Sequence, residues 1–295
     1  MTEATFVDHL QLLPLPSRDG ERQPDGEHRP GGLGLRTLAD RLGVLGWTAR
    51  NEDFAIERKL PDGRLAEAYA RAIGDAVASA RDRNRFPVVL SLVNGCALGV
   101  VDGTGTETET GVVWVSPVAA YRTGGFLRRP SVEESVLSRV TGRQTRDAFA
   151  IAPVTLPGDR IVIVGGRGVG AGERRALEAD GVRYLESERL ADLPVVVAET
   201  GAAEWVLHVD ATVFAAGVLP AADGSGDGDL GLDPLAEAVT RAFEGRRIGC
   251  VTIARYDLNR ESAVSAPALA GLLDRILLAA GGQPDPAARR QATAR

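Results

Sequence analysis

Continuous apolar runs of strand length recur along the chain, and stretches with helical spacing of apolar residues lie between them. Runs that are apolar at every position are typical of parallel strands covered by helices on both faces of a sheet. The predicted strands are residues 6–15, a short segment that starts at 46, and residues 87–93, 111–115, 160–164, 182–185, 204–214 and 248–253, with a further short apolar segment at 194–198. The predicted helices are residues 35–45, 64–80, 173–179, 234–243 and 267–280.

Strands that alternate with helices in this way predict a doubly wound parallel sheet. The chain has 295 residues, long enough for one large α/β domain or two small ones. Neither a repeat at a fixed period nor a linker divides it, so we expect a single α/β domain with about eight strands in three α/β/α layers. Residues 1–32 supply its first strand and a polar loop, residues 33–280 form the main α/β part, and residues 281–295 are expected to be a disordered tail.

Composition indicates a soluble globular protein, with 44% hydrophobic and 25% charged residues. The net charge of −6 argues against nucleic acid or an anionic membrane as the main partner. Because no stretch approaches about 18 uninterrupted apolar residues and no signal peptide is recognisable, we expect a cytoplasmic protein without a membrane span. Cys96 and Cys250 lie in apolar runs and are expected to be buried thiols.

The strand predicted at 204–214 carries His208 and Asp210, and a loop rich in Gly, Pro and Asp follows it. Open α/β folds place their chemistry at such strand ends. Asp210 is either a general base or an acceptor for a cationic ligand, or it caps backbone N–H groups or pairs with an Arg. His208 points to the same sheet face, where it either acts with Asp210 or is a core histidine with satisfied hydrogen bonds.

Five segments, in order and spacing, resemble the arginase/agmatinase (ureohydrolase) family. Residues 87–99 resemble a strand that ends in Gly-Gly-Asp-His-Ser before Leu-Gly, and residues 113–123 resemble Trp-Ile-Asp-Ala-His-Ala-Asp-Leu-Asn-Thr. Residues 164–167 are similar to a Gly-x-Arg turn, and residues 208–216 resemble Ser-Phe-Asp-Val-Asp-Val-Leu-Asp-Pro. Residues 249–259 resemble the family's last strand. The resemblance implies an eight-stranded parallel sheet.

The resemblance also implies a pair of manganese ions, held at strand ends by two His and four Asp, that activates water for attack on a guanidinium carbon. The positions that match the family's ligands are Asn94, Ser116, Val118, Ala120, Asp210 and Thr212. Only Asp210 keeps a ligand residue. The Glu that contacts guanidinium in the family falls on Ala254, and the proton-shuttle His falls near Glu133.

Manganese requires several hard oxygen or imidazole ligands in a defined geometry. One carboxylate, one carboxamide and two hydroxyls are too few for two such ions, so we expect no metal and no other cofactor. Asn94, Ser116 and Thr212 either line a ligand pocket with neutral polar groups or are small polar residues left where ligands stood. A pocket where Asn94, Asp210 and Arg122 converge would indicate a retained ligand.

These departures favour a non-catalytic pseudoenzyme with a binding or assembly role. The alternative is an enzyme: either a divergent family hydrolase acting on a guanidino or other C–N compound, or a metal-independent catalyst that uses Asp210 and His208. Because family members commonly form trimers or hexamers, we expect self-association or association with an active paralogue. A small cationic ligand near Asp210 is a further expectation.

Overall fold

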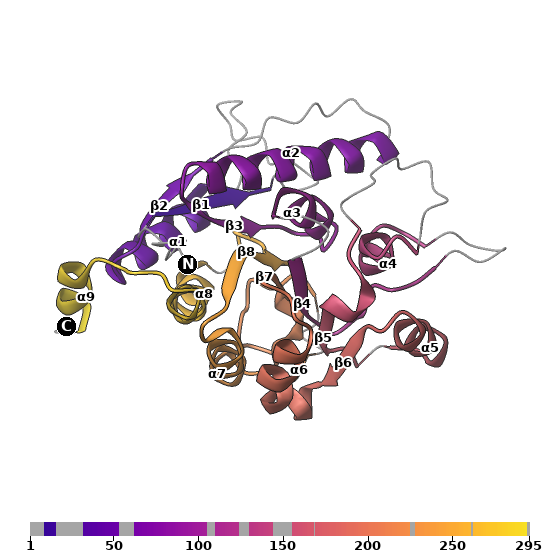
Figure 1. The fold of residues 1–295 in the computed structure, drawn as a ribbon. Helices are drawn as coiled ribbons and strands as arrows, with labels where there is room; N and C mark the ends of the chain where they lie inside the picture. Colours follow the sequence, from indigo (N-terminus) through magenta and orange to yellow (C-terminus); the bar gives the residue numbers. More distant parts are fainter. Residues whose placement is uncertain are drawn as a thin grey trace.

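The computed structural model describes residues 9–15, 32–52, 62–104, 110–123, 130–143, 155–167, 169–224, 228–260 and 262–293. Within these ranges the strands form one sheet of eight, and all neighbouring strands run parallel. The order β2-β1-β3-β8-β7-β4-β5-β6 places β8 and β7 in the middle (Figure 1). The strands are β1 (His9–Pro14), β2 (Thr48–Asn51), β3 (Phe86–Leu90), β4 (Thr110–Ser116), β5 (Ile161–Gly165), β6 (Arg183–Glu186), β7 (Glu204–Asp210) and β8 (Arg247–Ala254). The predicted parallel sheet of about eight strands is therefore confirmed.

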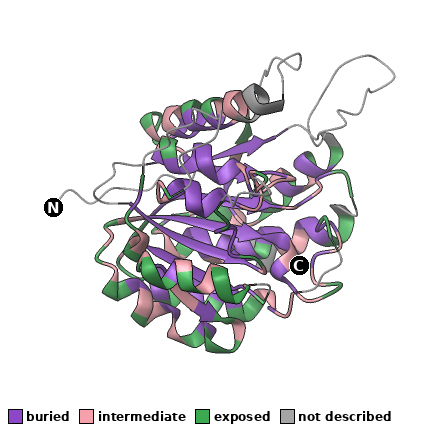
Figure 2. Cartoon of the chain, turned by 90° about the vertical axis from the view of Figure 1, so that its right-hand side faces the viewer, coloured by how far each residue is buried: buried purple, intermediate pink, exposed green. Residues whose placement is uncertain are grey.

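Helices cover both faces of this sheet. They are α1 (Gly32–Val44), α2 (Asp62–Asp82), α3 (Cys96–Thr104), α4 (Val136–Val140), α5 (Ala171–Ala179), α6 (Leu193–Glu199), α7 (Leu232–Phe243), α8 (Ser262–Ala279) and α9 (Pro286–Thr293). Side chains of α1, α6, α7 and α8 join one hydrophobic core, and those of α2, α3, α4 and α5 join the other. The strands between them are buried, apart from the edge strands β2 and β6, whereas the outward faces of the helices are exposed (Figure 2). Among the described helices none is long and apolar enough to cross a bilayer.

Alternation along β7 decides which face carries the polar strand end. Trp205, Leu207 and Val209 belong to the core under α7 and α8, whereas Val206 belongs to the core under α2 and α3. Because side chains two apart share a face of a strand, His208 and Asp210 lie on the side of α3. The candidate site is therefore built between the sheet and this short helix.

The sequence pattern does not predict helix α3, because nearly all of its residues are buried and the periodicity of an amphipathic helix is therefore absent. Glycines allow it to lie very close to α2. A Cβ added to Gly99 would fall 2.1 Å from the carbonyl oxygen of Ala70, and one added to Gly103 would fall 2.3 Å from that of Gly74. This close approach fixes α3, and with it the segment at the end of β3.

Two further segments differ from the prediction. The apolar segment at 194–198 belongs to helix α6, which begins with Pro194 in its first turn, where a missing N–H costs nothing. The predicted disordered tail, 281–295, contains helix α9 instead. Arg289 on α9 donates to Asp274 on α8 over 2.7 Å, so an ion pair that the sequence pattern does not reveal fastens this helix.

Candidate functional site

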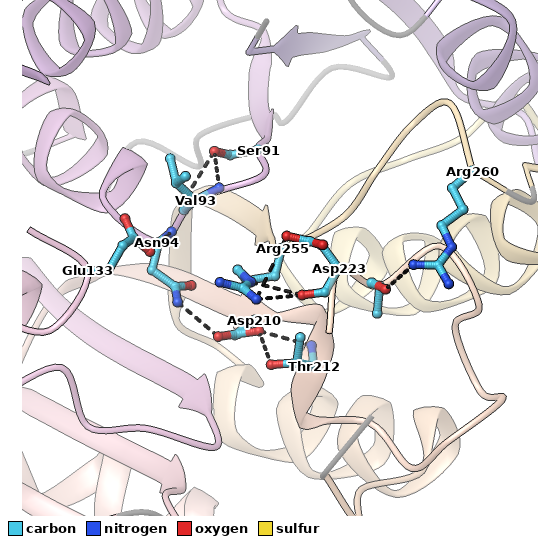
Figure 3. Close-up of polar contacts among 10 residues, drawn as sticks. Ser91, Val93, Asn94, Glu133, Asp210, Thr212, Asp223, Arg255 and Arg260 are labelled. Atoms are coloured by element: carbon cyan, nitrogen blue, oxygen red, sulfur yellow. Dashed lines mark hydrogen bonds and ion pairs between the residues drawn. The ribbon is translucent and has the colours of Figure 1, made fainter. Parts of the chain in front are cut away.

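The carboxyl ends of four neighbouring strands bring the predicted site residues together. In the order β3-β8-β7-β4, these strands are followed or closed by Asn94, Arg255, Asp210 and Ser116. Because the strands are parallel, all four ends meet at the same edge of the sheet. Figure 3 shows Asn94, Asp210, Thr212 and Arg255 grouped at this edge.

Asp210 is the centre of a hydrogen-bond network and is only 2% exposed. Its Oδ2 accepts from Asn94 Nδ2 at 2.9 Å and from Ser116 Oγ at 3.2 Å. Its Oδ1 accepts from the Thr212 backbone nitrogen at 2.9 Å and from Thr212 Oγ1 at 2.6 Å. A carboxylate offers about four lone-pair positions, and neutral donors fill all of them here. The three polar residues that the resemblance aligned with metal ligands thus all donate to the Asp210 carboxylate.

His208 lies in the core behind this network and is fully buried. Its Nε2 is 3.0 Å from Asn94 Oδ1, and its Nδ1 is 2.6 Å from Thr252 Oγ1. Since Asn94 turns its NH₂ group toward Asp210, its Oδ1 accepts the Nε2–H of the imidazole, and Nδ1 accepts from the Thr252 hydroxyl. The ring also stacks on Trp114, with centroids 3.8 Å apart and planes 7° apart.

Burial lowers the pKa of His208 to about 3, so the imidazole is neutral near pH 7. With both nitrogens engaged and no exposure, it has no lone pair available for a reacting group. Of the two interpretations of His208, this arrangement favours the satisfied core histidine.

The two apolar residues that the resemblance aligned with metal ligands contribute backbone groups only. Val118 is 42% exposed, and its backbone nitrogen donates to Ser116 Oγ at 3.2 Å. Ala120 is buried and has a left-handed backbone with φ of 50°, and its carbonyl accepts from Leu137 N at 3.0 Å. Neither side chain carries a donor atom for a metal.

Glu133 reaches the same edge from the segment before α4. Its carboxylate accepts from the backbone nitrogens of Asn94 at 2.8 Å and Gly95 at 2.9 Å, just before α3 begins. A carboxylate is favourable there because the free N–H groups of a helix carry positive partial charge. Glu133, which the resemblance aligned loosely with a proton shuttle, thus holds the Asn94 backbone in place.

Arg122 does not converge on Asp210 and Asn94, the arrangement that would have indicated a retained ligand. Arg122 donates to Glu134 over 2.8 Å, and its side chain is 56% exposed. The arginine at this edge is Arg255 at the end of β8 (Figure 3). One feature of the sequence indicates that Arg255 lies near the site. It directly follows Ala254, the position that the resemblance aligned with a guanidinium-binding Glu.

The buried thiols offer no nucleophile. Desolvation is the largest influence on the pKa of both thiols. It raises the pKa of Cys96 to about 12 and also raises the pKa of Cys250. Both groups therefore stay protonated near pH 7, and a thiol is a far weaker nucleophile than a thiolate.

The donor set does not fit a pair of manganese ions. Within the described ranges, no three His, Cys, Asp or Glu residues gather as a metal site would require. Asn94, Ser116 and Thr212 point hydrogens at Asp210, so their arrangement suits an anion acceptor rather than a cation. A metal bound to Asp210 would have to displace these donors and would gain few ligands in exchange.

Solved structures of arginases and related hydrolases share this fold. An arginase from Bacillus cereus superposes with a TM-score of 0.73 at 17% identity, covering 91% of this chain and 98% of that chain. An arginase from Entamoeba histolytica, in complex with L-ornithine, gives 0.74 at 14% identity over 93% and 99% of the two chains. The agmatine ureohydrolase of Thermoplasma volcanium gives 0.65 at 12% identity over 95% and 92%.

No protein-family model and no curated protein matches the sequence. At these identities the structural likeness establishes the class of fold, which is that of the ureohydrolases. The chain thus has the arginase fold over nearly its whole length, as the resemblance implied. Activity has to be inferred from the site, since one fold supports many functions.

Proposed function

We propose that this protein is an arginase-fold pseudoenzyme that works without a binuclear manganese site, in a binding or assembly role. The observation that carries the proposal is the environment of Asp210. Both of its oxygens accept hydrogen bonds from neutral donors of Asn94, Ser116 and Thr212. The carboxylate that would have been a metal ligand serves as an acceptor that joins the ends of β3, β4 and β7.

The metal-independent enzyme is less well supported. A general base needs a free lone pair within reach of a substrate proton. Asp210 has accepted four hydrogen bonds, and His208 has both nitrogens engaged below the surface. Other protein groups therefore occupy the hydrogen-bonding positions of both residues that a repurposed catalyst would use, and Asn94 lies between the two.

Thermal unfolding with and without Mn²⁺ tests the proposal. A ligand that binds only the folded state stabilises it by RT ln(1 + [L]/Kd). A manganese site with a micromolar Kd would therefore add about 4 kcal/mol to the free energy of unfolding at 1 mM Mn²⁺ and would raise the thermal midpoint measurably. We expect no shift in the parent protein and none in Asp210→Ala. A rise in the parent that Asp210→Ala abolishes would overturn the proposal.

The assembly role has its own test. We propose that the chain associates with itself or with an active arginase-fold paralogue, because the fold survives where the metal chemistry does not fit. Light scattering coupled to gel filtration should give a mass of two or more chains, or the paralogue should co-purify. A monomer without a paralogue over the physiological concentration range would contradict the assembly role.

A further inference from the structure

Helix α8 is a surface helix whose outer face is apolar. It packs between α1 and α7 on one face of the sheet (Figure 1). Within its residues 263–279 the exposed positions are all apolar, and they are Ala263, Val264, Gly271 and Leu278. The exposed positions of the neighbouring α7 include two carboxylates and an arginine. Because surface helices normally carry charged residues on their outer face, the outer face of α8 is typical of a helix that another element covers.

The two charged residues of α8 are engaged by neighbouring helices of the same chain. Asp274 is 7% exposed and accepts from Trp47 Nε1 at 2.8 Å and from Arg289 at 2.7 Å. Arg275 donates to Asp233 on α7 at 2.8 Å. Both side chains are thus directed toward neighbouring helices, and the exposed positions between them and the ends of α8 stay apolar.

Three of the exposed positions stand at a regular spacing, and we call them the apolar stripe. Val264, Gly271 and Leu278 are seven residues apart, so they share one face of the helix within about 20° per step. Val264 is 59% exposed and Leu278 is 40% exposed. A Cβ added to Gly271, midway between them, would have nothing within 4 Å. Apolar residues at this spacing are what one helix presents to another in helix pairs.

The symmetry of the apolar stripe indicates that its partner is a second copy of the same helix. A two-fold axis through Gly271 would set α8 antiparallel to α8 of the second chain. Val264 of each chain would then face the partner's Leu278, and a residue without a side chain would lie at the crossing point. A surface that matches itself in this way is what a two-fold dimer interface requires.

The flanking helices extend the apolar stripe to the size of an interface. Leu33 and Val44 on α1 are also exposed, so four of the six large apolar side chains exposed in the described part of the chain lie on α1 and α8. An α8 of 18 residues is about 27 Å long, and packed helices lie about 8–10 Å apart. Three such helices present roughly 600 Å² in outline. Since accessible surface exceeds outline, this approaches the about 800 Å² per partner that a standard interface buries.

The charges beside the apolar stripe also suit a second copy. The chain carries a net charge of −6, so two copies repel each other unless they meet through a neutral surface. The exposed charged residues of the flanking helices balance, because α1 contributes two arginines and one carboxylate and α7 contributes one arginine and two carboxylates. They are Arg36, Asp40, Arg41, Asp233, Glu237 and Arg241.

We propose that the outer face of α8, with α1 and α7 at its sides, is the surface through which two copies of this chain associate about a two-fold axis. The inference rests on the proposed assembly role and deepens it by naming the partner and the surface. Association removes Val264 and Leu278 from water, and the burial of apolar surface is the driving force for such contacts.

A carboxylate placed in the apolar stripe tests the interface. Light scattering coupled to gel filtration should give a mass of two chains for the parent and of one chain for Val264→Glu, because an unpaired charge in an apolar contact is strongly unfavourable. Val195→Glu is the matched control, since Val195 is 61% exposed and lies on α6, which packs against α7. It should keep the mass of two chains. Circular dichroism checks that each variant is folded, and Leu278→Glu takes the place of Val264→Glu if that variant is not.

A cysteine on the proposed axis tests the symmetry. Cys96 and Cys250 are buried, so Gly271→Cys supplies an exposed thiol that should meet its own copy across the two-fold axis. Mild oxidation should convert most of Gly271→Cys into a covalent dimer on a non-reducing gel. Val195→Cys, treated in the same way, should stay a single chain.

The outcomes separate this inference from the proposed function. If the parent has a mass of two chains and both glutamate variants keep it, association occurs through another surface, so the inference is wrong and the assembly role stands. A parent of three chains has the same meaning, since a two-fold interface pairs chains. A monomeric parent that co-purifies with a paralogue also overturns the inference alone, whereas a monomer without a paralogue overturns the inference and the assembly role together.

Discussion

Replacing Asp210 by asparagine tests whether the carboxylate is the acceptor at the centre of the site. The side chain keeps its shape but changes one oxygen into an NH₂ group. Each oxygen of Asp210 faces one donor that its surroundings hold in place. At Oδ1 this is the backbone nitrogen of Thr212, and at Oδ2 it is the amide nitrogen of Asn94, whose Oδ1 lies 3.0 Å from His208 Nε2. Neither orientation of the new amide therefore avoids setting a donor against a donor.

The cost of Asp210→Asn follows from this geometry. An unsatisfied buried donor costs roughly 1–3 kcal/mol, and hydrogen bonds to a charged acceptor are worth about 1.5–3 kcal/mol each. We expect a loss of about 3 kcal/mol in the free energy of unfolding. For a chain of this size, with roughly 2 °C per kcal/mol, the midpoint should fall by about 6 °C.

Urea unfolding at pH 7 measures the change, with Asp223→Asn as control. The Asp223 side chain is 55% exposed, and its ion pair is long, so its loss should change stability by less than about 0.5 kcal/mol. A metal-ligand cluster would behave in the opposite way, because removing one carboxylate from a set of unfilled ligands relieves repulsion. A loss below about 1 kcal/mol for Asp210→Asn, or a gain, would refute the reasoning.

Three further predictions concern the core, the helix packing and the strained turn. Burial lowers the pKa of His208 to about 3, so below about pH 6.5 the unfolded state binds a proton that the folded state does not. The free energy of unfolding should therefore fall with decreasing pH by up to about 1.4 kcal/mol per pH unit. His208→Gln should flatten that slope in urea titrations between pH 7 and 4. Gly103→Ala should cost about 2 kcal/mol or more by calorimetry, since its Cβ would fall 2.3 Å from a carbonyl oxygen of α2, whereas Gly271→Ala, with open space around it in α8, should stabilise by up to about 1 kcal/mol. Arg255→Gly should be about 1 kcal/mol more stable than Arg255→Ala, because only glycine adopts the φ of 55° without strain; equal midpoints would contradict that.

The sheet was predictable from the sequence because its strands carry a local signal. β3, β4 and β5 are buried at every position, so runs of about five residues without a polar side chain mark them. The same signal fails for α3, where burial on all sides removes the helical period, and for α6, whose apolar run is as short as a strand. Helix α9 depends on an ion pair with a residue on another helix, which no local pattern contains.

The sequence predicts the site residues that stand at strand ends. It does not predict the partners of those that reach the site through a helix cap or a turn. Parallel strands carry Asn94, Ser116 and Asp210 to one edge whatever their side chains do. Glu133 and Arg255 join the edge through a helix cap and a left-handed turn. Both depend on tertiary contacts, so spacing along the chain could place them near the site but could not assign their partners.

The most direct test of the central claim is the metal content of the purified protein, measured by elemental mass spectrometry after growth with added manganese. An acceptor network at Asp210 in place of a metal site predicts manganese close to zero per chain, unchanged in Asp210→Ala. A pair of manganese ions per chain that is lost in Asp210→Ala would contradict the account and would indicate a ureohydrolase-type hydrolase.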